Sequence, residues 1–160
     1  MDRHKVRLAA EQSFALMSQL GLATGGDGET RTGIVLTLRH TRDMAFAPSR
    51  IQMTVGTVAD PDKLSTYECC SDEKARRLAF THSEMGHVLS FQSANEELGR
   101  YQGSALDGDW IASGSGLSAE ADEAFVLCWH VKMGLLATDD ALELASISEN
   151  TTFRTIAEHL

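Results

Sequence analysis

Six histidines in 160 residues are the first side chains to test for metal or cofactor chemistry. The densest group is Thr81-His-Ser-Glu-Met-Gly-His87. On an unbroken helix His82 and His87 are five residues apart, so their side chains point about 140° from each other. A helical zinc pair is spaced four residues apart instead. We therefore expect polar histidines near a helix end rather than a zinc site, which would need a break at Gly86.

A single histidine sets no spacing, so haem binding through one axial ligand stays open for His82 or His87. Such an iron needs apolar walls that keep water away. Near the end of this helix three neighbouring side chains would supply part of those walls: Met85, Leu89 and Phe91. The same two histidines are the candidates for acid/base work if the chain is an enzyme.

Nucleophilic catalysis and nucleotide binding find little support. The cysteines Cys69, Cys70 and Cys128 form no even disulfide framework, and nothing local activates them. The segment 114–119 matches the G-x-G-x-x-A pattern of a dinucleotide loop. However, too little chain follows Ala119 to complete a mononucleotide-binding half, and the next helical turn is acidic. We expect these glycines to let the chain turn tightly onto a sheet.

The composition is that of an acidic globular domain. The net charge of −9 argues against a nucleic-acid partner, which needs a clustered positive surface. Its 42% apolar and 23% charged residues suggest no disorder, and 160 residues suit a single domain over 1–160. The longest apolar run, 124–129, is too short to cross a membrane, and no signal peptide is visible. We expect a cytoplasmic protein with reduced thiols.

The spacing of apolar residues predicts helices and strands in mixed order. We expect helices over 4–20, from 71 or 72 to at least 82, and from the Ser118 cap onward; strands over 34–38, 51–55 and 110–112, with a short strand over 64–70 and an ambiguous segment over 88–91. Residues 138–160 read as a helical extension with a polar break at 146–152. Consecutive strands without helices between them favour an antiparallel sheet in an α+β domain.

The helix after Ser118 is apolar nearly all round. From Ala124 to Ala137 only His130 and Lys132 are clearly polar. Such a helix is buried on more than one side, as a central helix or a subunit contact. We interpret His130 as a core histidine bonded to a carbonyl, and we expect a homo-oligomer because the stripe with His130 still carries Val126 and Leu127.

The segment 107–124, Asp-Gly-Asp-Trp-Ile-Ala-Ser-Gly-Ser-Gly-Leu-Ser-Ala-Glu-Ala-Asp-Glu-Ala, resembles the end of the GlcG/HbpS-like family, which includes the C-terminal domain of PduO-type proteins. The matching residues are Ser115, Gly116, Glu120, Asp122, Glu123 and Ala124; Asp72, Glu73, Lys74, Ala75 and Ala79 resemble that family's Lys-Ala helix. The resemblance implies a profilin-like fold with about five antiparallel strands, oligomerisation, and haem or small-molecule binding in some members. The family's double glycine is reduced here to Gly103, and the extension after Thr138 has no counterpart.

These observations lead to a small-ligand-binding or sensor domain, with haem or a related tetrapyrrole as a possible ligand, assembled as a homo-oligomer. His87, His82 and Met85 are the expected ligand-site residues. Two alternatives stay open. One is an acidic dimeric interaction or chaperone protein, and the other is an enzyme acting on a small molecule through His82 or His87.

Overall fold

The structure is a computed structural model that describes residues 1–43, 47 and 49–160. In these residues four strands form one antiparallel sheet in the order β2-β1-β4-β3, with five α-helices around it. The elements are α1 Arg3–Gln19, β1 Gly33–His40, β2 Ile51–Gly56, α2 Pro61–Met85, β3 Ser104–Asp107, β4 Trp110–Ser115, α3 Ala119–Met133, α4 Thr138–Ile147 and α5 Thr151–Ala157. The α+β class, the antiparallel sheet and the C-terminal helices are confirmed, but the sheet has four strands rather than about five.

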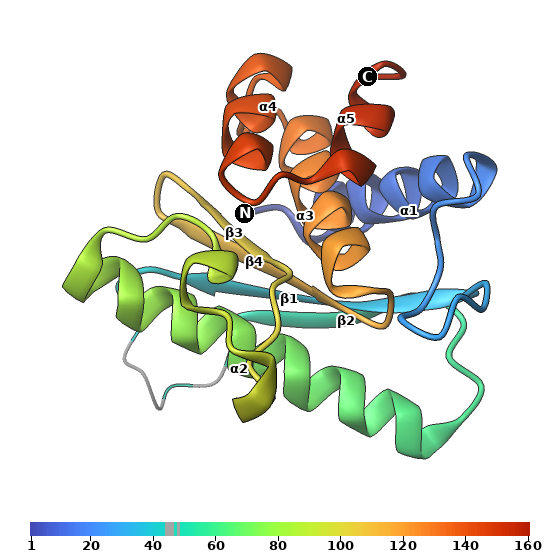
Figure 1. Ribbon diagram of the computed structural model, residues 1–160, viewed down its shortest axis with the longest axis horizontal. Helices are drawn as coiled ribbons and strands as arrows, with labels where there is room; N and C mark the ends of the chain where they lie inside the picture. The colour runs from blue at the N-terminus through green and yellow to red at the C-terminus, as the bar shows by residue number, and fades with distance from the viewer. Residues whose placement is uncertain (44–46, 48) are drawn as a thin grey trace.

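The sheet separates two layers of helices (Figure 1). Helix α2 lies alone against one face, over β1 and β4, whereas α1 and α3 lie on the other face. The main core fills the space between the sheet, α1 and α3. Under α2 lies a smaller apolar cluster of Ala75, Leu78, Leu106 and Ile111. The rest of the buried face of α2 is polar, and it carries Ser71, Lys74 and Thr81.

Helix α2 begins at Pro61, well before the start at 71 or 72 that the sequence indicated, because its first turn is strongly capped. The Asp60 carboxylate accepts from the amides of Asp62 and Lys63, and Pro61 occupies the first turn. The strand expected over 64–70 is therefore wrong, and this segment is helical. The helix runs past His82, as expected, and ends at Gly86, whose φ of 71° lies in the left-handed region.

The segment after α2, over 88–91, was ambiguous between helix and strand in the sequence, and it forms neither an α-helix nor a strand. Residues Ser90–Ser93 and Glu96–Leu98 form 3-10 turns, and Leu89 meets the sheet through a single bridge to Ala105. At the edge of the sheet beside β4 lies β3, a four-residue strand that no sequence pattern revealed. The described sheet has four strands because 64–70 is helical and Leu89 makes only a single bridge, while β3 is gained.

Helix α3 is the central helix of the molecule. Residues 121–130 are all buried, since α1, β4, α4 and α5 surround them. Val126 and Leu127, which we expected to form an outer stripe, are fully buried within the chain itself. Figure 1 shows the reason: α4 and α5 cover the side of α3 that faces away from the sheet. Val126 and Leu127 therefore offer no surface for a subunit contact. No helix of the described residues is long and apolar enough to span a membrane.

Candidate ligand-binding site

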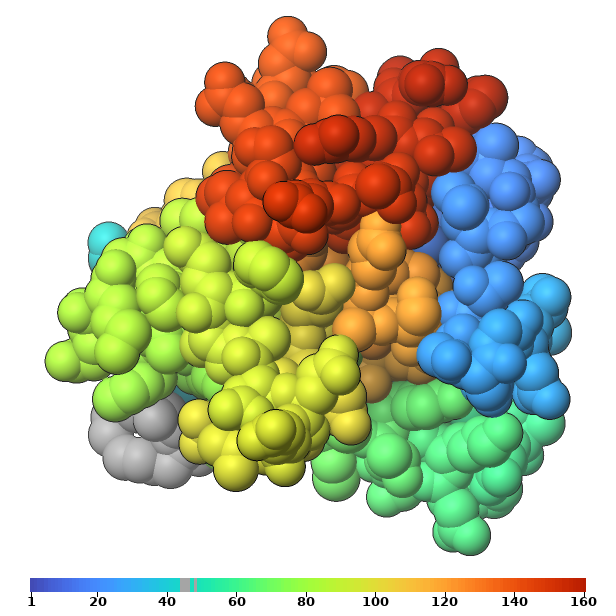
Figure 2. All heavy atoms as spheres, viewed as in Figure 1, coloured from blue at the N-terminus to red at the C-terminus, as the bar shows by residue number. Residues whose placement is uncertain are grey.

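A pocket of about 370 Å³ opens where α2, the turn before α3 and the 96–101 segment meet. In Figure 2 these segments (green, orange and yellow) adjoin one another on the face that the view presents. The walls combine Tyr67, Tyr101 and Leu117 with the small residue Ala119 at the start of α3. Three charged residues also line it: Lys74 and Asp122, which are buried, and Glu96, which is exposed. We call this cavity the Lys74 pocket.

Lys74 and Asp122 form an ion pair that is almost completely buried. Each is 3% exposed, and Lys74 Nζ lies 2.8 Å from Asp122 Oδ2. Nζ also donates to the Gly114 carbonyl at 3.0 Å, while Asp122 Oδ1 accepts from the Leu117 amide at 2.9 Å. Both carboxylate oxygens are therefore bonded, as is needed to hold a charge away from water.

The pair is an unusual feature to find at a cavity. Burial raises the pKa of the Asp122 carboxyl, and the adjacent Lys74 ammonium opposes that rise. Removing two charges from water costs several kcal/mol per ion, and their attraction repays that cost only with good geometry. A buried ion pair is thus weak evidence for a stabilising role. Beside a pocket, it is a candidate for function.

Two glycines allow the backbone to approach the pair closely. A Cβ at Gly103 would lie 2.8 Å from Asp122 Cβ and 2.9 Å from Lys74 Nζ. Gly103 also has a φ of 126°, which side chains disfavour. A Cβ at Gly114 would meet the Asp122 carbonyl oxygen at 3.0 Å. The absence of side chains here is required by the pair.

The start of α3 follows from local sequence as expected. Ser118 is the N-cap, and its Oγ accepts from the Ala121 amide at 3.3 Å. Gly116 precedes it with a φ of 139°, which confirms the tight turn that we inferred from the glycines. A Cβ at Gly116 would meet the Gly33 carbonyl oxygen and the Tyr67 ring, each at 3.2 Å. The turn thus brings the first residues of α3 to the mouth of the pocket.

Burial makes two of the three thiols, Cys70 and Cys128, poor nucleophiles. Cys70 lines the Lys74 pocket, and burial raises its pKa. Burial also raises the pKa of Cys128, which lies in the core, and Cys69 is exposed on α2. Raising a thiol pKa reduces the fraction of reactive thiolate at neutral pH. All three cysteines are free of disulfides.

The expected histidine site lies elsewhere and is only partly assembled. His87 and Met85 line an open groove of about 1010 Å³ with Phe80, but His82 does not. His82 Nδ1 is instead bonded to the His87 carbonyl at 2.9 Å, beside the C-cap of α2. Met85 is 67% exposed. The structure thus brings His87 and Met85 into one groove, whereas the His82 ring is bonded to the backbone that follows α2.

The other walls expected for this site are not where we placed them. Leu89 is fully buried in the main core, and Phe91 is not part of the groove. Four charged residues of α2 line the groove in two ion pairs: Asp72 with Arg76, and Glu73 with Arg77. Apolar and charged side chains of α2 therefore line the same groove.

Two further titratable groups are internal and structural. His130 is a core histidine as expected, with Nδ1 bonded to the Val126 carbonyl at 3.1 Å. Burial lowers its pKa to about 4. Glu123 is fully buried and accepts from Ser148 and Asn150 between α4 and α5, and burial raises its pKa. Glu123 thus ties the C-terminal helices to α3.

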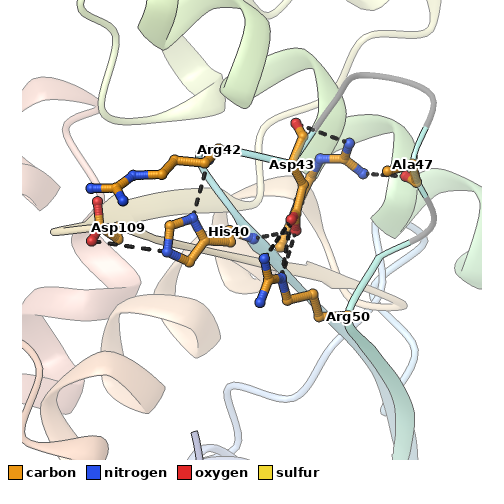
Figure 3. Close-up of polar contacts among 7 residues, drawn as sticks. His40, Arg42, Asp43, Ala47, Arg50 and Asp109 are labelled. Atoms are coloured by element: carbon orange, nitrogen blue, oxygen red, sulfur yellow. Dashed lines mark hydrogen bonds and ion pairs between the residues drawn. The ribbon is translucent and has the colours of Figure 1, made fainter.

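A polar network at the end of β1 also has a structural role (Figure 3). The Asp43 carboxylate accepts from Arg50 at 2.7 Å and from the His40 amide at 3.0 Å, and Arg50 holds its pKa below the usual range. His40 Nε2 lies 3.9 Å from Asp109, and its ring packs edge-on against Trp110. These side chains engage one another, so they fix the end of the hairpin rather than present free groups to a ligand.

Comparisons with protein-family models, curated proteins and solved structures gave no match to this chain. Within the described residues, no group of three or more histidine, cysteine or acidic side chains is arranged to hold a metal ion. Lys74 and Asp122 are among the residues that carry the family resemblance, but the sequence alone indicated no role for either. A lysine on the same helical face as Ser71, Ala75 and Leu78 was the signal that it would be buried.

Proposed function

We propose that this chain is a small-ligand-binding domain and that its ligand occupies the Lys74 pocket. The observation that carries the proposal is a buried, directly bonded ion pair at a cavity whose other walls include Tyr67, Tyr101 and Leu117. Ligand pockets of small molecules usually have this composition, with a few polar groups that set orientation, and volumes upward of about 300 Å³. A sensor role would follow if the bound ligand changes how α2 and α3 are held.

The residues of the family resemblance support the same location. Lys74 comes from the Lys-Ala helix segment, whereas Gly116 and Asp122 come from the other matched segment. These segments are distant in the chain, and the Lys74 pocket is where they meet. On this basis we extend the proposal to a profilin-like fold, in which the Leu89–Ala105 bridge stands where a fifth strand would pair.

The proposal is tested by a small-molecule screen that uses backbone amide NMR shifts. We expect hits to perturb the amides of residues 116–119. Ala119→Phe fills the mouth of the pocket and should abolish these shifts. The matched control is Ala94→Phe, which places the same ring in the His87 groove and should leave them unchanged. Hits that bind Ala119→Phe as well as the wild type, or that perturb only the groove, would overturn the proposal.

A second candidate function is haem binding in the His87 groove. It is favoured by one observation: His87, Met85 and Phe80 line a groove much larger than the Lys74 pocket. His87 would be the axial ligand, because His82 already contacts the loop. Haem titration of the wild type, His87→Ala and His82→Ala tests it. Loss of the Soret shift in His87→Ala alone supports this function, and no binding by the wild type rejects it.

Self-association remains a proposal, now on a different surface. Phe80, Met85 and Leu98 are each at least 60% exposed, and they belong to α2 and the second 3-10 turn. Burying large apolar side chains of this kind is the usual basis of a dimer contact. Sedimentation at micromolar concentration tests it. A species of 17.4 kDa at all concentrations would show that the chain is a monomer.

A further inference from the structure

Lys74 differs from every other lysine in the described part of the chain. Lys5 and Lys63 are exposed and Lys132 is half-buried, whereas Lys74 is 3% exposed and lines a cavity. An ammonium group has three protons to donate. Two of them are bonded, to Asp122 and to the Gly114 carbonyl. The third has no bonded acceptor among the described residues, so it is available to a molecule in the pocket.

We propose that Lys74 captures a small uncharged carbonyl compound, an aldehyde or a ketone, as an imine. This inference rests on the proposed function, because it requires that ligands enter the Lys74 pocket. Lysine amines form imines with carbonyl substrates when a nearby group can remove the ammonium proton. Asp122 Oδ2, at 2.8 Å from Nζ, is that group. Its distance is within the reach expected of a general base.

The reaction balances with the two side chains alone. Asp122 takes a proton from the ammonium, and the nitrogen lone pair forms a bond to the carbonyl carbon while the carbonyl π electrons move to oxygen. Asp122 returns the proton to that oxygen, which gives a carbinolamine. Asp122 then takes a second proton from nitrogen and delivers it to the hydroxyl, which leaves as water as the C=N bond forms. Ammonium and carbonyl compound become iminium and water, with no oxidant or reductant.

The surroundings suit the product as well as the reaction. The iminium keeps the positive charge of Lys74, so its attraction to Asp122 survives. The iminium has one N–H left, which can donate a hydrogen bond to the Asp122 carboxylate. The hydrogen bond from Nζ to the Gly114 carbonyl is then lost. The charged side chains that line the pocket are Lys74, Asp122 and Glu96. An anionic ligand would thus meet two carboxylates against one ammonium, which favours an uncharged compound.

The test is reductive trapping of the wild-type protein with butanal and sodium cyanoborohydride at neutral pH. Peptide mapping by mass spectrometry then follows the addition of one butyl group to each lysine. Proton transfer by Asp122 should make Lys74 react at least about tenfold faster than the exposed Lys63. In Lys74→Arg, which keeps the charge, this fast modification should disappear. In Lys63→Arg, the matched control, it should persist.

The variant Asp122→Asn tests whether the fast reaction of Lys74 needs the Asp122 base or only the location of Lys74 in the cavity. If circular dichroism shows that this variant is folded, Lys74 should be modified at about the rate of Lys63. The wild-type comparison needs no variant and decides the proposal alone: modification of Lys74 no faster than Lys63 overturns it. If screened compounds still shift the amides of residues 116–119 in that case, the ligand-binding proposal stands without the imine. If they do not, both proposals are wrong.

Discussion

Replacing His130 by glutamine should make the free energy of unfolding much less sensitive to acid. His130 is fully buried, and burial lowers its pKa from 6.5 to about 4. The unfolded chain therefore takes up a proton on this residue well before the native protein does. The contribution of neutral His130 to the free energy of unfolding is at its full value above pH 6.5, and it is lost as the pH falls toward 4. At about 1.36 kcal/mol per pKa unit, the loss between pH 7.5 and pH 4 is about 3 kcal/mol.

The assay is urea unfolding of the wild type and His130→Gln at a series of pH values. Asp122 and Glu123 have raised pKa values, so their contributions change in the opposite direction over part of the same range. Both proteins share those groups, and the difference between their curves isolates His130. We expect the glutamine variant to be less stable near neutral pH and to regain about 3 kcal/mol relative to the wild type by pH 4. Parallel curves would refute the assignment of a neutral core histidine.

Three further predictions concern buried polar groups. Lys74→Met should lower the free energy of unfolding, measured with urea, by about 3–5 kcal/mol, because Asp122 is left buried without a partner. Adding Asp122→Leu to this variant should recover part of that loss, and strictly additive effects of the two substitutions would contradict the coupling. Glu123→Gln should raise the melting temperature most at alkaline pH, because the pKa of Glu123 is raised and the wild type loses stability as the pH rises through that pKa. An equal change in melting temperature at all pH values would count against this. Gly103→Ala should lower the melting temperature more than Gly108→Ala. Both glycines have positive φ, but only at Gly103 would the added Cβ have neighbours within 4 Å. Equal melting temperatures of the two variants would show that close packing at Gly103 does not matter.

Much of the fold was accessible from the sequence because local signals were clear. The apolar stripe of α1, the alternating residues of β2 and the Ser118 cap each predicted the element observed. The start of α2 was missed because residues 64–70 contain aromatic and β-branched side chains, although Asp60 and Pro61 carried the capping signal. Strand β3 was missed because it has four residues, and its pairing with β4 is a long-range contact that no local pattern reports.

The candidate site was harder to foresee for a physical reason. Lys74 and Asp122 are 48 residues apart, and no local pattern reports that two residues so distant in the chain form a pair. Their burial depends on Gly103 and Gly114, which approach from the sheet. The histidines attracted attention because their residue type suggests chemistry, but type alone did not show that His82 faces a loop carbonyl. Burial of a charge, rather than residue type, identified the pocket.

The central claim, that the Lys74 pocket holds the ligand, is tested most directly by soaking crystals of the wild-type protein with a library of small fragments. We predict electron density for bound fragments between Tyr67 and the start of α3, with an acceptor atom within hydrogen-bond distance of Lys74 Nζ. Fragments that gather in the His87 groove while the Lys74 pocket holds only water would contradict the claim.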